Sequence, residues 1–347
     1  MITVGMSTSC VFPMSTDEAF RLARLTGFDG VEVMVTADRG TRRLDLLRAS
    51  SARWGLPVLS VHAPVLPIAH FTFGRDQHDK LLRSAELAAG LGAATVVVHP
   101  PFLWQRAFSA RFLDSVREIA DSTGVALAVE NMFPLRLGPL GLDVYRPGHD
   151  PSGFDVDAAT LDFSHAAVAG RDALDLALAL GSRLRHVHLT DGLVSQRPGG
   201  LRDQHRVPGR GGQPVAEVLT HLSRSGWSGS VVAEVHAGSA GRGEEARVDL
   251  LRRTVAFARR HLATGPLVPR QTTSTVATTA SGTATTAIPR PASMNRPQDT
   301  STPIDESREC QSSVASDAQG VTRQPMLTPT STATSRSGDP ATGSSAR

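Results

Sequence analysis

Short apolar runs rich in β-branched residues recur between residues 2 and 236, each bounded by polar residues or glycine. Runs of this length and composition predict buried strands. We expect eight strands, at Ile2–Met6, Gly30–Met34, Pro57–His62, Ala94–His99, Val125–Glu130, Ala159–Phe163, Leu184–Leu189 and Ser230–His236.

Stretches with helical spacing separate most of these strands. Apolar residues recur three and four positions apart in Thr16–Thr26, Asp79–Leu91 and Phe112–Ser122, which is typical of helices with one buried face. A glycine follows each expected helix, as a C-cap residue does, at Gly27, Gly55, Gly92, Gly124, Gly181 and Gly226.

Eight strands alternating with helices predict an α/β fold, the (β/α)8 TIM barrel. A doubly wound open sheet is the alternative. It would not distribute polar strand ends over so many strands, and no GxGxxG motif follows the first strand. Because that motif is the usual signal of dinucleotide binding, we expect no nucleotide cofactor.

Six expected strands end in a side chain that can bind a metal. In a parallel barrel all strand ends meet at one face, so six such side chains would surround one centre. One histidine or glutamate alone would more often be structural, but six together favour a metal site. They are His62 in LSVHAP, His99 in VVVHPP, Glu130 in LAVEN, Asp162 in ATLDFSH, His188 in RHVHLTD and Glu234 in VVAEVH.

Carboxylates and imidazoles without cysteine suit a divalent metal such as Mn, Mg, Co or Zn. Glu130, Asp162, His188 and Glu234 would supply three carboxylates and one imidazole, with positions left for a chelating diol or hydroxyketone. Glu130 and Glu234 end the fifth and eighth strands, where they could flank a substrate. One could then remove a proton while the other returns it.

Composition changes near Gly265. From Pro266 to Arg347 there is no aromatic residue, and Ser, Thr, Pro and Ala are abundant. Such a segment buries too little apolar surface to offset the entropy lost on ordering. We expect the barrel at residues 1–265 and a disordered tail at 266–347.

Charge and cysteine content narrow the protein class. The formal charge of +3 in 347 residues is too small to favour nucleic acid or an anionic membrane, and Lys80 is the only lysine. Two cysteines, Cys10 and Cys310, suit a reducing compartment. The start MITVGMSTS is too polar for a signal sequence. We expect a soluble cytoplasmic protein, and the sequence leaves the oligomeric state open, a homo-oligomer included.

The motifs HAP, HPP, EN, LDFSH, HVHLTD, DQH, GRGG and AEVH resemble those of the xylose isomerase-like TIM barrel superfamily over about residues 1–262. That group includes sugar-phosphate isomerases and epimerases, ketose 3-epimerases, inosose dehydratases and endonuclease IV. The resemblance to the ketose epimerases implies a metal held by Glu130, Asp162, His188 and Glu234, with the two glutamates also serving as acid and base. It implies a carbohydrate-like small molecule as substrate.

Endonuclease IV suggests an alternative, a three-metal phosphodiesterase that uses a metal-activated hydroxide. Two departures disfavour it: Arg210 stands where that family usually has an acid, and His62-Ala63-Pro64-Val65 lacks an aromatic residue that would probe DNA. A third hypothesis, a non-catalytic sugar-binding barrel, would not need both glutamates. The endonuclease IV set is matched in type throughout, at His62, His99, Glu130, Asp162, His165, His188, Asp203, His205 and Glu234.

Two long connections, Asn131–Ala158 and Asp191–Gln213, follow ligand-bearing strands, and we place both over the site. Arg210 or Arg206 would bind a substrate phosphate or carboxylate, and Trp104 would stack on a sugar face. The predicted substrate contacts are His62, His99, His165, His205, Arg210, Trp104 and His236. The possible additional metal ligands are His62, His99, His165, Asp203 and His205.

Overall fold

A computed structural model describes residues 1–64, 71–137, 140–193, 203–237 and 243–263. The chain divides into two units, Met1–Thr273 and Ser274–Arg347, and every described residue belongs to the first. The expected disordered tail at 266–347 lies outside the described residues, as does most of the centre of the Asp191–Gln213 connection.

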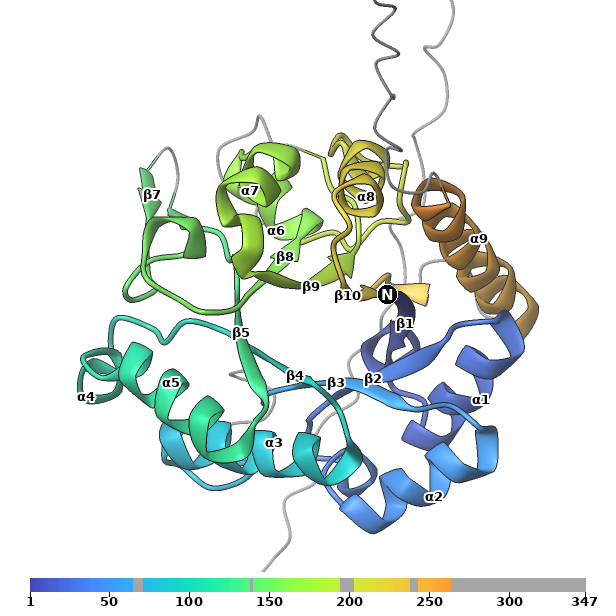
Figure 1. Cartoon of the computed structure of the whole chain (residues 1–347), viewed down its shortest axis with the longest axis horizontal. Helices are drawn as coiled ribbons and strands as arrows, with labels where there is room; N and C mark the ends of the chain where they lie inside the picture. Colours follow the sequence, from blue (N-terminus) through green and yellow to red (C-terminus); the bar gives the residue numbers. More distant parts are fainter. Residues whose placement is uncertain (65–70, 138–139, 194–202, 238–242, 264–347) are drawn as a thin grey trace, which may run out of the picture. The chain divides into compact units, whose positions relative to one another are not determined.

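Eight parallel strands close into a barrel, in the order β1, β2, β3, β4, β5, β8, β9, β10, with β10 pairing back to β1 (Figure 1). The predicted TIM barrel is therefore confirmed, and the open sheet is wrong. All eight expected strands are present, with ends shifted by a few residues: β1 Ile2–Ser7, β2 Gly30–Met34, β3 Val58–His62, β4 Thr95–Val98, β5 Ala126–Glu130, β8 Ala159–Asp162, β9 Leu184–Leu189 and β10 Gly229–Ala233.

Helices surround the barrel on its outside, as Figure 1 shows. The three helices expected from apolar spacing are confirmed within two residues at either end. The helices are α1 Thr16–Thr26, α2 Leu44–Trp54, α3 Gln77–Leu91, α4 Arg106–Ser109, α5 Phe112–Thr123, α6 Phe163–Ala169, α7 Ala173–Leu180, α8 Val215–Arg224 and α9 Glu244–Leu262.

Capping residues set several helix boundaries. Ser15 accepts a hydrogen bond from the Glu18 N–H at the start of α1, and Gly27 ends that helix in the left-handed conformation. Gly226 was expected as the cap of α8, but Ser225 holds that position and Gly226 follows it.

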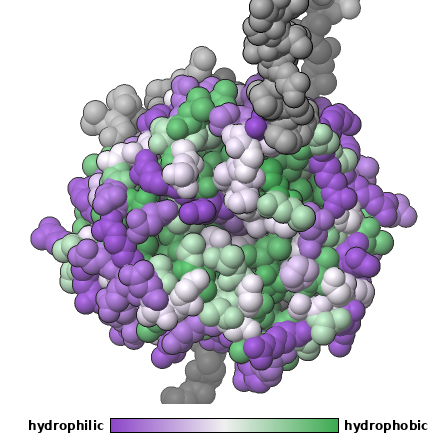
Figure 2. Space-filling model, in the orientation of Figure 1, coloured by the Kyte–Doolittle hydropathy of each residue, from purple (hydrophilic) through white to green (hydrophobic). Residues whose placement is uncertain are grey.

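The core lies between the strands and the helices. α1 buries Phe20 and Leu22 completely, and β2 contributes Val31 and Val33. In Figure 2 hydrophilic residues gather along the outer edge of the face shown, and hydrophobic residues lie nearer its middle. The barrel packing thus forms a rigid frame whose strand ends can hold polar groups in fixed positions.

The connection after β5 begins beside the site, where the ring of Phe133 lies 5.2 Å from that of His165. It forms a hairpin of β6 Leu135–Leu137 and β7 Leu140–Leu142, and further on Val144 and Tyr145 pack with Met132 and Phe102 in a small separate apolar cluster. Among the described residues no helix is both long and apolar enough to cross a membrane.

Candidate metal centre

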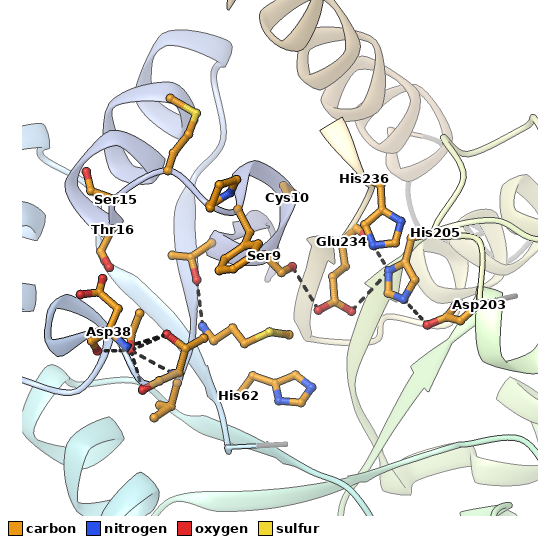
Figure 3. Close-up of a pocket in the computed structure, with 18 of the residues that line it drawn as sticks. Ser9, Cys10, Ser15, Thr16, Asp38, His62, Asp203, His205, Glu234 and His236 are labelled. Carbon is orange, nitrogen blue, oxygen red and sulfur yellow. Dashed lines mark hydrogen bonds and ion pairs between the residues drawn. The ribbon is translucent and has the colours of Figure 1, made fainter. Parts of the chain in front are cut away.

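A cavity of about 810 Å³ opens at the C-terminal ends of the barrel strands (Figure 3). Side chains from both halves of the barrel line it. Asp162 and His188 lie deeper and are fully buried. Eight of the predicted site residues are in the lining: His62, His99, Glu130, His165, Asp203, His205, Glu234 and His236.

Glu130, Asp162, His188 and Glu234 form the predicted four-residue group. Each offers one ligand atom, and the four atoms lie within 4.8 Å of one another. His188 Nδ1 is 2.9 Å from Glu130 Oε1 and 3.2 Å from Glu234 Oε2, and 3.7 Å from Asp162 Oδ2. All four residues are buried, so the group is shielded from bulk water.

Glu130 connects this group to a second one. Its Oε2 is 2.8 Å from His99 Nε2 and 3.4 Å from His62 Nε2. His62 Nδ1 lies 3.0 Å from the Ala63 carbonyl oxygen, which can only accept a hydrogen bond. A proton on Nδ1 leaves the lone pair of His62 Nε2 facing Glu130.

A third group comprises His165, Asp203 and His205. Asp203 Oδ2 lies 2.6 Å from His205 Nε2 and 3.3 Å from His165 Nε2. The three ligand atoms satisfy the same 4.8 Å limit as the first group. The structure therefore brings together all nine residues shared in type with the endonuclease IV set.

Local structure fixes these side chains. Asp162 is the N-cap of α6, and its Oδ1 accepts from the His165 N–H at 2.8 Å. Asn131 holds the Asp162 backbone through two hydrogen bonds. His205 has a positive φ of 39°, a conformation that histidine tolerates better than most residues.

Asp191 anchors the segment that carries Asp203 and His205. This buried carboxylate accepts hydrogen bonds from four backbone N–H groups. The donors lie at both ends of the connection, so the carboxylate ties its two ends together. They belong to Gly192, Gly209, Gly211 and Gln213.

The two glutamates of the first group have pKa values displaced in opposite directions. Burial raises the pKa of Glu234, and three nearby imidazoles do not fully offset it. Burial alone would also raise the pKa of Glu130, but attraction by His188 and His99 holds it well below the usual range. Paired carboxyl groups with separated pKa values are typical of acid/base chemistry.

The pKa values of the third group are also displaced. Burial would lower the pKa of His205, but its hydrogen bond to Asp203 and the charge of Glu234 raise it to about 10. Burial would raise the pKa of Asp203, but its contacts with His165 and then with His205 hold it well below its usual range. An anionic carboxylate at this position is available to a cation.

The four-residue group fits a divalent cation. Glu130 Oε2 and Asp162 Oδ2 are buried and make no hydrogen bond of acceptable geometry with the described residues. Buried carboxylate oxygens without a partner are costly. Oxygen and nitrogen donors without sulfur are the ligands that Mn, Mg, Co and Zn accept.

Two predicted substrate contacts lie outside the cavity lining. Trp104 is exposed and stacks on Phe102 with ring centroids 4.4 Å apart. Arg210 is exposed on the loop, where its carbonyl accepts from Arg206. His236 is in the lining, 4.8 Å from the His205 ring.

Part of the cavity was not foreseen. The segments after β1 and β2 add Ser9, Phe12, Thr16, Thr36 and Asp38 to the lining. Figure 3 shows Thr16 and Asp38 across the cavity from Glu234 and Asp203. Ser9 Oγ donates to Glu234 Oε1 at 3.2 Å. The sequence MSTS places hydroxyl residues at the end of the first strand. That position was the signal from which this part of the cavity could have been predicted.

A closed parallel barrel with buried acid and imidazole groups at its C-terminal mouth defines the class of protein. A family model described as xylose isomerase-like TIM barrel matches residues 20–261. The chain therefore belongs to the xylose isomerase-like TIM barrel family.

Relatives of similar length share the barrel region. An uncharacterised protein of Mycobacterium tuberculosis (strain ATCC 25618 / H37Rv) is 42% identical over 281 residues, covering 75% of this chain and 98% of its own. An uncharacterised protein of Mycobacterium leprae is 40% identical, with 76% and 98% covered. Fructoselysine 3-epimerase of Escherichia coli O157:H7 is 21% identical, with 67% and 89% covered.

Solved structures confirm the fold. A D-tagatose 3-epimerase-like protein has a TM-score of 0.55 at 19% identity, covering 75% of this chain and 98% of its own. The 3-keto-D-glucoside 4-epimerase of E. coli has a TM-score of 0.55 at 18% identity, with 75% and 100% covered. The IolI protein, solved with a bound zinc atom, has a TM-score of 0.52 at 17% identity, with 75% and 98% covered.

Proposed function

We propose that this protein is a metal-dependent isomerase or epimerase of a sugar, sugar phosphate or polyol. The observation that carries the proposal is the pair Glu130 and Glu234. They share one buried group with Asp162 and His188, and their pKa values are displaced in opposite directions. Family membership supports the same chemistry.

The residues have distinct roles in this proposal. Asp162 and His188, with both glutamates, would hold the metal, which would polarise the substrate carbonyl and the neighbouring hydroxyl. One of the two glutamates, in its anionic form, removes the proton from the carbon beside the carbonyl, and the other, in its protonated form, returns a proton to that carbon or its neighbour. The Ser9 hydroxyl holds Glu234 in place by a hydrogen bond.

The unforeseen part of the cavity would hold the far end of the substrate. Thr16 Oγ1 is buried and has no hydrogen-bond partner among the described residues. Thr16 Oγ1 and Asp38 Oδ2 each lie 3.0 Å from the position that a Cβ on Gly40 would take, so the glycine leaves space between them. A substrate hydroxyl there could donate to Asp38 and accept from Thr16.

Proton exchange tests the proposal. We expect the full-length protein with Mn²⁺ to incorporate deuterium beside the carbonyl of a ketohexose in D₂O, screened by NMR over fructose, tagatose and allulose. Glu234→Gln should lower the exchange rate by roughly 100-fold or more, while Glu217→Gln, an exposed glutamate on α8, should leave it unchanged.

Undiminished exchange in Glu234→Gln would remove that residue as the acid/base. Ketose binding without exchange by the wild-type protein would favour the non-catalytic sugar-binding barrel.

A second candidate function is a three-metal phosphodiesterase. The observation that favours it is the third group, His165, Asp203 and His205, which lines the same cavity as Glu130. Three metals side by side would suit attack on a phosphodiester by an activated hydroxide.

Elemental analysis of the purified full-length protein separates the two candidates. One Mn, Mg or Co per chain supports the isomerase. Two or three metals, mostly Zn, together with nicking of a duplex at an abasic site and a steep salt dependence, support the phosphodiesterase. Failure to nick at any salt concentration would exclude this second candidate for abasic DNA.

A further inference from the structure

A buried carboxylate lies beneath the candidate metal centre and is absent from the cavity lining. Glu32 on β2 is fully buried, as are His186 and His188 on β9. β2 and β9 are not neighbours in the barrel order, so these side chains meet across the barrel interior. A buried charge needs compensating partners, and each oxygen of Glu32 has a different one.

Glu32 Oε2 is held in place from two sides. Ser60 Oγ on the neighbouring strand β3 donates to it at 2.8 Å. His186 Nε2 lies 2.9 Å away, at ion-pair distance. Two contacts on one oxygen fix the carboxylate plane and determine where Glu32 Oε1 points.

Glu32 Oε1 faces His188. It lies 3.3 Å from His188 Nε2, at ion-pair distance, and neither atom makes a hydrogen bond of acceptable geometry with the described residues. The opposite ring nitrogen, His188 Nδ1, is the one that faces Glu130, Asp162 and Glu234. The two nitrogens of His188 therefore face separate carboxylate groups.

Neighbouring rings restrict the tilt of His188. His62 stacks on it with ring centroids 5.6 Å apart and an interplanar angle of 12°. His186 meets it edge to face at 5.1 Å and 88°. The ring has little freedom to rotate, so a change at Glu32 acts mainly on the position of the His188 proton.

We propose that Glu32 is a positioning residue, which keeps the proton of His188 on Nε2 and thereby leaves the Nδ1 lone pair directed at the metal. Metal-binding histidines commonly donate their second ring N–H to a carboxylate, which fixes the tautomer and strengthens the ligand. The inference rests on His188 being a metal ligand, and it holds for either candidate function.

The same three residues could instead hold a metal of their own, since Glu32, His186 and His188 offer ligand atoms within 4.8 Å of one another. That arrangement would require His188 to give both nitrogens to metals and to lose its ring proton. One carboxylate accepting a proton from His188 needs no such step, and the geometry favours it.

Metal affinity of the full-length chain tests the proposal without reference to any substrate. We expect Glu32→Gln to weaken Mn²⁺ and Zn²⁺ binding by about 10–100-fold in competition with a chelator, with the number of metals per chain unchanged. Glu217→Gln is the control, since this exposed glutamate on α8 belongs to none of the clusters, and its metal affinity should equal that of the wild type.

Nitrogen-15 NMR of the histidine rings provides a second readout. The proposal predicts that His188 is protonated on Nε2 in the wild type, and that Glu32→Gln introduces the Nδ1-protonated tautomer in the metal-free protein. A folded Glu32→Gln variant with unchanged affinity and tautomer would overturn the proposal. Loss of one whole metal per chain would instead identify a separate metal site.

Ser60→Ala covers the case in which Glu32→Gln does not fold. It removes the hydroxyl that holds Glu32 Oε2 but retains the charge. We expect a weaker effect in the same direction, on the order of a 3-fold loss in metal affinity. If Glu32→Gln does not fold and Ser60→Ala binds metal as tightly as the wild type, the orientation of Glu32 does not control metal affinity.

Discussion

Glu130 uses both of its carboxylate oxygens in the candidate centre. Oε1 faces His188 and His165, at 2.9 and 3.3 Å, while Oε2 faces His99 and His62. A carboxylate placed in this way can bridge two cations, and its removal affects both groups at once. We therefore expect the number of metals that the chain can hold to depend strongly on this residue.

Substitution of Glu130 tests that dependence. Glu130→Gln keeps the shape but removes the charge, and we expect metal affinity to fall by roughly 100-fold, the upper end of the range seen when groups around a metal are changed. Isothermal titration with Mn²⁺ and Zn²⁺ measures it, with Glu217→Gln as control. Wild-type affinity in Glu130→Gln would mean that the metal is held without it.

At the scale of elements, the connection between β9 and α8 brings Asp203 and His205 to His165, which lies on α6. Asp191 lies two residues after the end of β9. Its carboxylate holds the far end of the connection by accepting hydrogen bonds from the backbone N–H groups of Gly209, Gly211 and Gln213. Gly211 must be a glycine there, because a Cβ would lie 2.1 Å from Asp191 Oδ1. The sequences HLTD and GRGG thus encode the contact that joins the two ends of this connection.

Removal of this anchor should destabilise the loop and the third group together. Asp191→Ala leaves several donors without a partner, and we expect a loss of about 3 kcal/mol in the free energy of unfolding, measured by urea denaturation. Asp172→Ala, which removes only the N-cap of α7, should cost about 1 kcal/mol. A smaller loss for Asp191→Ala than for this control would contradict the anchoring role.

On the scale of the whole molecule, the described barrel is complete before residue 264. β1 pairs with β10, and α9 ends at Leu262 after burying Leu250 and Leu251. The M. tuberculosis relative is covered over 98% of its length by 75% of this chain. The barrel therefore contains the elements that a stable fold needs.

Removal of residues 266–347 should therefore leave thermal stability nearly unchanged. We expect a shift in Tm of less than about 2 °C, since a change of this size corresponds to under 1 kcal/mol in a domain of this length. Differential scanning calorimetry measures it. Truncation before Glu244, which also removes α9, should lower Tm strongly, and a comparable loss in the shorter truncation would mean that the boundary near 265 is wrong.

Much of the site could be predicted because the ends of buried strands can be recognised from the sequence pattern. His62, Glu130, Asp162 and His188 each end a β-branched run, and barrel closure alone requires such ends to meet. Asp203 and His205 lie in a loop without periodicity, and they were found through the resemblance. Asp191 and Asp38 belong to no sequence pattern, so the sequence alone assigned neither residue a role.

The sequence by itself determined the order of strands and helices and the residue types at the strand ends, because both depend on periodicity and local preference. Only the tertiary structure decided that Glu130 joins two groups and that Glu32 faces His188 from across the barrel. Strand register, barrel curvature and side-chain rotamers set those contacts, and each depends on the packing of residues far apart in the chain.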